Sequence, residues 1–289
     1  MTISNSGYRL DIGNIIITAV SDGVVPMPID MLYPDMLGDI WDQYRDRFPE
    51  AFGADGFMIN LGSFVIRSAD RTILVDTGVG QYSLWPTMWP PIPEATPGPA
   101  ELMNDLKGKG FDASSIDTVF LTHLHGDHVG WNMSDGKPTF PNARYIIPRH
   151  EYEHWTDEEF KKNWPHIDVQ VTPLADLNIL DLVDDGYNIT DEVSTMETPG
   201  HTAGHTSLVI SSGGEQGFVL GDVCNNPVQA HFTDWCPIFD MDPAKARQTR
   251  HAVLDKLEAE GTLVSAGHFP DPGFGHFVRV QGKRLWQGV

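Results

Sequence analysis

Short apolar runs separated by turn residues open the chain and predict a β-sheet. Residues 14–23 (NIIITAVSDG) and 56–78 (GFMINLGSFVIRSADRTILVDTG) are rich in β-branched residues, a pattern typical of strands. Residues 79–99 are rich in proline and tryptophan, and we expect an irregular loop there, of a length typical of lids and binding loops. Residues 99–110 (PAELMNDLKGKG) predict a short helix that ends at its glycines.

Later apolar segments each lead into a polar residue. The segment DTVFLT is followed by His123, GFVLG by Asp222 and TLVSAG by His268. The less regular segment EVSTMETPG leads into His201. Polar residues at the ends of successive strands indicate a site along one edge of a sheet.

The clearest helix in the sequence covers residues 242–261. Asp242 is its expected N-cap, Pro243 lies in the first turn and Gly261 is expected to end it. Strands that alternate with such helices predict an α/β protein built in layers. Because no change in composition marks a boundary, we expect residues 1–289 to form a single domain.

Composition restricts the partners that the chain can bind. Hydrophobic residues make up 40% and charged residues 20% of the chain, as in ordinary globular proteins. The formal net charge of −21 disfavours nucleic acid and anionic membranes and favours a neutral small-molecule substrate. The N-terminus (MTISNSGYRLDIG) shows no secretory signal, and Cys224 and Cys236 are too few for a disulfide framework. We therefore expect a cytoplasmic protein with reduced thiols.

The segment TVFLTHLHGDHVGWN (residues 118–132) carries the strongest chemical signal. His123 and His125 are two positions apart, so on an extended strand end they share a face and can bind one metal ion. Asp127 and His128 are adjacent, point in different directions and can serve a second ion. A solvated polar loop is the alternative interpretation, but it does not require this order of residues.

Further metal ligands are available in three other segments. TPGHTAGHTS supplies His201, VLGDVCN supplies Asp222 and SAGHFP supplies His268. Each of these residues follows a glycine, which lets the backbone approach the site closely. Together with the first segment they suit two ions of the Zn, Mn, Fe or Co type.

The order HLHGDH, GHT, GD and GHF resembles that of the metallo-β-lactamase-fold hydrolases, from ILVDTG to GHF. The resemblance implies an αββα sandwich, with two mixed sheets flanked by helices and a two-metal site at one edge. It also implies that Asp76 and His205 support the metal ligands from behind. The implied ligands are His123, His125 and His201 for one metal, Asp127, His128 and His268 for the other, and Asp222 as the bridge.

The segments NARYIIPRHEYEHW and DMDPAKARQTR are similar to those of a branch that contains quorum-signal lactonases and methyl-parathion-hydrolase-like enzymes. This similarity implies a dinuclear-metal hydrolase, with zinc as the expected metal and Mn, Fe or Co as alternatives. A bridging hydroxide would attack a neutral lactone or an aryl or carboxylic ester, and Asp127 would pass a proton to the leaving oxygen. An organophosphate triester hydrolase, a glyoxalase II-like thioesterase and a metal-binding regulatory protein without turnover remain alternatives.

Candidate pocket residues are aromatic or polar side chains near the ligands. Asn225 stands at the third position after Asp222, where acyl-homoserine lactonases carry a tyrosine, and asparagine cannot supply a phenolic proton. The loop 79–99 would either close over the substrate or contact a second copy of the chain in a homodimer. The full set of candidates is Trp85, Met88, Trp89, Asn225, Phe269 and His276.

Overall fold

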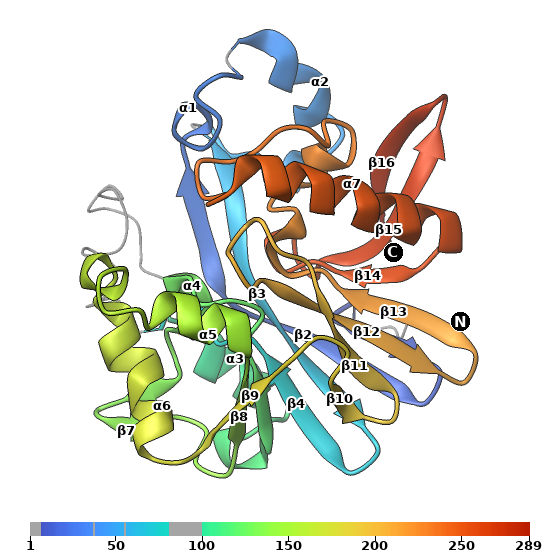
Figure 1. The fold of residues 1–289 in the computed structure, drawn as a ribbon. Helices are drawn as coiled ribbons and strands as arrows, with labels where there is room; N and C mark the ends of the chain where they lie inside the picture. Colours follow the sequence, from blue (N-terminus) through green and yellow to red (C-terminus); the bar gives the residue numbers. More distant parts are fainter. Residues whose placement is uncertain (1–6, 37, 55, 81–99) are drawn as a thin grey trace.

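Two seven-stranded sheets make up the core of the protein, and helices lie outside them (Figure 1). The computed structural model describes residues 7–36, 38–54, 56–80 and 100–289. The predicted pocket residues Trp85, Met88 and Trp89 therefore lie outside the described residues.

The first sheet has the strand order β1-β2-β3-β4-β5-β8-β9. Its first four strands are antiparallel neighbours, whereas β4, β5, β8 and β9 run parallel to one another. The strands are β1 (Arg9–Ile12), β2 (Ile15–Met27), β3 (Phe57–Ser68), β4 (Arg71–Val75), β5 (Thr118–Phe120), β8 (Arg144–Pro148) and β9 (Leu180–Val183).

The second sheet has the order β10-β11-β12-β13-β14-β15-β16. All its neighbours are antiparallel except β13 and β14, which run parallel. The strands are β10 (Asn188–Thr190), β11 (Val193–Glu197), β12 (Thr206–Ser212), β13 (Glu215–Val219), β14 (Leu263–Ser265), β15 (Phe274–Val280) and β16 (Lys283–Gly288).

Alternation along the strands explains why the predicted strand segments are so apolar. In β4, Ile73 and Val75 face the core between the sheets, while Leu74 faces a second core beneath the helices. In β13, Val219 lies in the core between the sheets and Phe218 in the core on the other face. Strands buried on both faces are expected to have continuous apolar runs. The layered α/β fold predicted from the sequence is confirmed.

Helices cover the outer face of each sheet. Leu106 of α3 and Trp155 of α5 pack on the first sheet, whereas Leu254 of α7 packs on the second. The helices are α1 (Ile29–Leu32), α2 (Asp42–Arg45), α3 (Leu102–Gly108), α4 (Gly126–Val129), α5 (Arg149–Trp155), α6 (Thr172–Asp176) and α7 (Pro243–Glu260). Short helical turns occur at Asp39–Trp41, Pro49–Ala51, Ala113–Ser115, Lys161–Asn163, Ile167–Val171, Gly221–Val223 and Pro227–Ala230, and β6 (Met133–Ser134) pairs with β7 (Lys137–Pro138).

The expected ends of the long helix are confirmed. The Asp242 carboxylate accepts hydrogen bonds from the backbone N–H groups of Ala244 and Lys245, so it caps the start of α7. Gly261 has a left-handed backbone with φ of 63°, which ends the helix. Among the described residues, no helix has the length and apolarity that a membrane crossing requires.

Candidate metal centre

Pairs of parallel strands bring the chemical segments to one place. β4 and β5 are paired with Val75 opposite Phe120, so Asp76 and the His123 loop leave the first sheet at the same edge. β13 and β14 are paired with Val219 opposite Ser265, and the segments to Asp222 and His268 leave the second sheet together. The seven predicted ligands lie in three overlapping groups, within each of which the candidate ligand atoms lie within 4.8 Å of one another.

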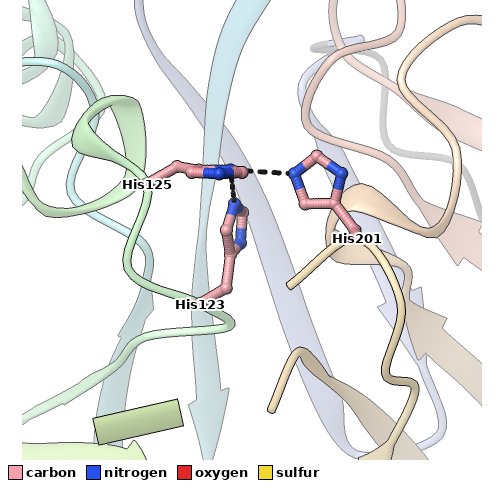
Figure 2. Close-up of side chains that lie close together, drawn as sticks. All are labelled: His123, His125 and His201. Atoms are coloured by element: carbon pink, nitrogen blue, oxygen red, sulfur yellow. Dashed lines mark hydrogen bonds between the residues drawn. The ribbon is translucent and has the colours of Figure 1, made fainter. Parts of the chain in front are cut away.

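Three imidazoles form the first group (Figure 2). Nδ1 of His125 lies 3.1 Å from Nε2 of His123 and 2.9 Å from Nε2 of His201. His123 and His201 are buried. Three ring nitrogens that converge in this way present donor atoms for one cation.

In two of these rings, those of His123 and His201, the nitrogen that points away from the group also has a hydrogen-bond partner. Nδ1 of His201 lies 2.9 Å from the Asp240 carboxylate, which can only accept a hydrogen bond. Nδ1 of His123 lies 3.0 Å from the Thr122 hydroxyl, and that hydroxyl donates its own proton to Asp76. Both histidines therefore carry the proton on Nδ1 and keep a lone pair on Nε2.

The second group consists of His128, His268 and Asp127. Nδ1 of His128 donates to the Asp76 carboxylate at 2.8 Å, and Nδ1 of His268 donates to the backbone carbonyl of Asn60 at 2.8 Å. Their Nε2 atoms, which are the nitrogens left to bind a metal, lie 3.3 Å apart. The Asp127 carboxylate lies 3.6 Å from Nε2 of His268.

Asp222 lies between these two groups, and with His123 and His128 it forms the third. Its carboxylate is 3.2 Å from Nε2 of His201 in the first group and 3.1 Å from Nε2 of His268 in the second. It is also 3.5 Å from Nε2 of His128. A single carboxylate that contacts both groups has the position required to bridge two metals.

The electrostatics of the cluster favour cations. Burial, and then the neighbouring imidazoles, hold the pKa of His123 and His125 well below 6.5, so both rings are neutral, as metal ligation requires. Burial opposes charge on His128 as well, but the carboxylates of Asp222, Asp127 and Asp76 outweigh it and raise its pKa to about 10. Where carboxylates impose a proton on a buried ring in this way, a metal cation can take the place of that proton.

A pocket opens onto these residues. His125, Asp127, His201, Asp222 and His268 all line it, and so does the predicted residue Asn225. Its apolar wall comes from β2, α1 and β3, through Val25, Met27, Leu32, Ile59 and Leu61. None of these wall residues was predicted to line a pocket. Val25 and Met27 also lie beyond the predicted strand segment 14–23, because β2 continues to Met27.

Comparison with known proteins agrees with this geometry. A model of the metallo-beta-lactamase superfamily matches residues 63–268. The chain belongs to the metallo-beta-lactamase superfamily. It is a metal-dependent hydrolase.

Individual members of the superfamily resemble the chain at moderate identity. The N-acyl homoserine lactonase AiiA of Bacillus thuringiensis subsp. kurstaki is 26% identical over 226 residues, which cover 74% of this chain and 83% of that protein. The crystal structure of the hydrolase AbOPH superimposes with a TM-score of 0.84 at 26% identity, covering 98% and 97% of the two chains. The dizinc quorum-quenching lactonase AidC has the same fold, with a TM-score of 0.79 at 22% identity over 97% and 96% of the chains.

Two residues predicted to support the ligands lie behind them in this metallo-beta-lactamase fold. Asp76 accepts hydrogen bonds from Thr122 and His128, and its own backbone has a left-handed φ of 61°. His205 accepts a hydrogen bond from the backbone N–H of Asp222 at 2.9 Å, and burial lowers its pKa to about 3. The neutral ring of His205 therefore orients Asp222, although His205 itself belongs to none of the three groups.

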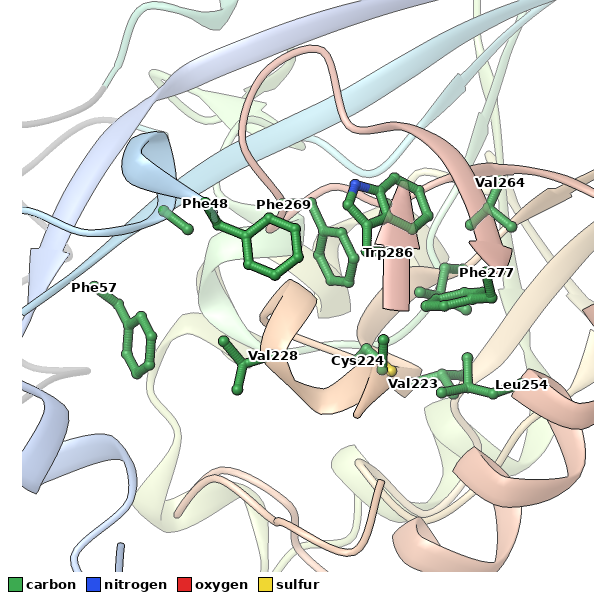
Figure 3. Close-up of a cluster of buried hydrophobic side chains, with 14 of the residues drawn as sticks. Phe48, Phe57, Val223, Cys224, Val228, Leu254, Val264, Phe269, Phe277 and Trp286 are labelled. Atoms are coloured by element: carbon green, nitrogen blue, oxygen red, sulfur yellow. The ribbon is translucent and has the colours of Figure 1, made fainter. Parts of the chain in front are cut away.

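Two predicted pocket residues are located elsewhere in this hydrolase. Phe269 is fully buried in a hydrophobic cluster beside Trp286, at 4.8 Å between ring centroids (Figure 3). Burial of this apolar ring in the core is favourable, so the side chain packs there and does not line the pocket. His276 lies on β15, where its Nδ1 contacts the backbone carbonyl of Thr262 at 3.0 Å. Neither residue lines the pocket.

Glu151 is a supporting residue that the sequence did not reveal. It is fully buried on α5, and burial raises the pKa of its carboxyl. The carboxylate accepts hydrogen bonds from the backbone N–H of Leu124 at 3.0 Å, from the Thr202 hydroxyl at 2.8 Å and from the backbone N–H of Gly204 at 2.7 Å. Leu124 stands between His123 and His125, so Glu151 joins their loop to that of His201.

Replacing Glu151 by alanine should therefore weaken metal binding by about 10- to 100-fold, the usual effect of removing a residue that orients metal ligands. Competition with a chromogenic chelator measures the metal affinity. Glu153 is exposed on the same helix, and Glu153→Ala serves as the matched control with unchanged affinity. Equal metal affinity in the two variants would contradict the role assigned to Glu151.

Proposed function

We propose that the protein is a dinuclear metal hydrolase of neutral esters and that lactones are its main substrate class. The observation that carries the proposal is the fixed orientation of four buried histidines. Each has its Nδ1–H held by a carboxylate, a hydroxyl or a carbonyl, so Nε2 is the nitrogen left to bind a metal. The four are His123, His128, His201 and His268.

The chain offers a complete set of ligands for two ions. His123, His125 and His201 would bind one ion, and Asp127, His128 and His268 would bind the other, with Asp222 shared between them. Imidazole and carboxylate donors suit zinc, and manganese, iron and cobalt are the alternatives. When bound, such ions supply a Lewis acid and lower the pKa of water toward neutrality.

Hydrolysis adds the oxygen of water to the carbonyl carbon, breaks the ester C–O bond and places a proton on the leaving oxygen. Asp127 is the group that we assign to this proton transfer, because its carboxylate lines the pocket. Asp240 and Asp76 hold the imidazoles in a single orientation throughout. The apolar wall of β2 and β3 excludes water and contacts the acyl part of the substrate.

Three observations support a neutral lactone. Among the described residues that line the pocket there is no lysine or arginine, so an anionic substrate would find no counter-charge from a side chain. The relative AiiA, 26% identical, is named an N-acyl homoserine lactonase. The net charge of −21 acts in the same direction, since it repels anions from the whole molecule.

Chelation tests the proposal. Treatment with a strong chelator should lower lactone hydrolysis by about 100-fold or more, because the attacking water loses its activation. Two equivalents of zinc or manganese should restore it, with metal content measured by elemental analysis. The same preparation is assayed on an acyl homoserine lactone, an aryl ester, a phosphotriester and a thioester. Activity that survives complete metal removal, or turnover of the phosphotriester or thioester in preference to both esters, would overturn the proposal.

A further inference from the structure

We propose that Asp22 is a positioning residue for the metal ion assigned to the second group, and that it acts on His128 through two backbone segments. The Thr77 segment (residues 76–80) follows β4, and the His128 segment (residues 128–132) begins within α4. This inference rests on the dinuclear centre of the proposed function. It adds that the two ions depend on different buried carboxylates.

Asp22 lies in β2 at an irregularity of the first sheet. The pairing of β2 with β3 shifts its register between Ser21 and Val24, as at a β-bulge. A bulge breaks the regular alternation of side chains along a strand and can aim one of them in a new direction. The Asp22 side chain is fully buried, and a buried carboxylate is unfavourable unless hydrogen-bond donors surround it.

Four N–H groups donate to this carboxylate. Its Oδ2 accepts from the backbone N–H groups of Val79 at 2.9 Å and Gly80 at 3.0 Å. Its Oδ1 accepts from the backbone N–H of Leu102 at 2.8 Å and from the indole Nε1–H of Trp131 at 3.0 Å. Each oxygen thus accepts two hydrogen bonds, and Asp22 joins the Thr77 segment to the His128 segment.

The two segments are also bonded directly to each other. The backbone N–H and the hydroxyl of Thr77 both donate to the backbone carbonyl of His128, at 2.8 Å and 3.2 Å. The backbone N–H of Gly130 donates to the carbonyl of Gly78 at 2.8 Å. The backbone position of His128 therefore depends on the position of the Thr77 segment, which Asp22 holds.

Close packing strengthens this dependence. A Cβ atom on Gly80 would lie 2.1 Å from the carbonyl oxygen of Gly130, and one on Gly130 would lie 2.0 Å from the backbone of Val79. Only glycine allows the two backbones to approach so closely. The Thr77 segment also contains Asp76, which accepts the hydrogen bond from Nδ1 of His128. A shift of this segment would therefore move both the backbone and the ring of His128.

The first group has a different support. Glu151 accepts hydrogen bonds from the backbone N–H groups of Leu124 and Gly204, and so joins the His123 loop to the His201 loop. Within the described structure, the four hydrogen bonds of the Asp22 carboxylate go to neither of these loops. We therefore expect a change at Asp22 to weaken the ion of the second group more than that of the first.

Asp22→Asn tests the proposal, because an amide keeps the size of the side chain but has one acceptor oxygen instead of two. Whichever way the amide turns, its NH₂ group faces two N–H donors, and the Thr77 segment or the His128 segment loses its hold. We expect the zinc affinity of the second group to fall about tenfold, the lower end of the usual effect of residues that orient metal ligands. The affinity of the first group should stay unchanged. Zinc titration against a chromogenic chelator measures both binding steps.

The chain offers variants that assign the two steps and a matched control. His125 belongs only to the first group and His268 only to the second, so His125→Ala and His268→Ala identify the step of each ion. Asp105→Asn is the control, because Asp105 accepts a hydrogen bond from the backbone N–H of Ser21, the neighbour of Asp22 in β2. This variant should retain both affinities.

Each outcome separates the two proposals. Unchanged zinc binding in Asp22→Asn, or an equal loss at both steps, overturns the role of Asp22 while two ions in the wild type still support the proposed function. Fewer than two ions in the metal-loaded wild type overturns the dinuclear centre itself. Trp131→Phe is the second variant, since it removes only the indole donor, and it should weaken the same ion. If Asp22→Asn does not fold, an unchanged second step in Trp131→Phe overturns the proposal.

Discussion

Replacement of Asp222 by alanine is expected to lower kcat/KM by about 1000-fold or more, as the loss of a main electrostatic element of an active site does. Asp222 is the residue whose carboxylate contacts both groups of imidazoles, at 3.2 Å from His201 and 3.1 Å from His268. Without it, the two groups lose the ligand that they share. The buried imidazoles also lose the charge that compensates a cation, so we expect the metal content to fall below two ions per chain.

Elemental analysis and steady-state kinetics on the same preparation provide the measurement. Asp222→Asn keeps the size of the side chain and removes its charge, so it separates the loss of charge from the loss of packing. Asp234→Ala is the control, because the side chain of Asp234 is 77% exposed and pairs with the surface residue His251. An Asp222→Ala enzyme with two bound ions and wild-type kinetics would contradict both the bridging position and the proposed chemistry.

The predicted ligands could be found in the sequence because their pattern is local. His123, His125, Asp127 and His128 fall within six residues after an apolar strand, and the structure places all of them in the candidate metal-binding groups. Each remaining ligand directly follows a glycine after an apolar segment. The order of strands in the sheets could not be read from the sequence, but the parallel pairs β4–β5 and β13–β14 explain why these segments meet.

The supporting residues were harder to predict because their partners are remote in sequence. Asp240 is 39 residues from His201, and Glu151 is 53 residues from Gly204. No motif marks either residue, since an isolated carboxylate before a helix or within one is common on protein surfaces. Their burial depends on tertiary packing, which the sequence pattern does not specify. Phe269 and His276 were assigned to the pocket from their nearness to His268 in sequence, which says little about side-chain direction.

Arg250 makes several hydrogen bonds close to the candidate metal centre. Through them, we expect this one residue to affect both the stability of the fold and the position of the metal ligands. Arg250 lies on α7 and is fully buried. Its guanidinium donates to the backbone carbonyl of Val223 at 2.6 Å, to that of Trp235 at 2.8 Å and to the Asp240 carboxylate at 2.7 Å. Val223 directly follows Asp222 in the sequence, and Asp240 orients His201.

Arg250→Met is therefore expected to lower the free energy of unfolding by about 3–5 kcal/mol, the usual effect of breaking a buried ion pair. The methionine keeps the packing of the aliphatic chain but leaves the Asp240 carboxylate buried without its arginine. Denaturant unfolding of the metal-free protein measures the change without a contribution from metal binding. Because Asp240 then holds His201 less firmly, the metal affinity should fall as well.

Arg247→Met provides the matched control on the same helix. Arg247 is half-buried and donates a weak hydrogen bond to the Cys236 thiol at 3.9 Å, so its loss should change the free energy of unfolding by less than about 1 kcal/mol. Similar unfolding free energies in the two variants would mean that Asp240 finds other donors when Arg250 is absent. The coupling between α7 and the His201 loop would then have to pass through packing alone.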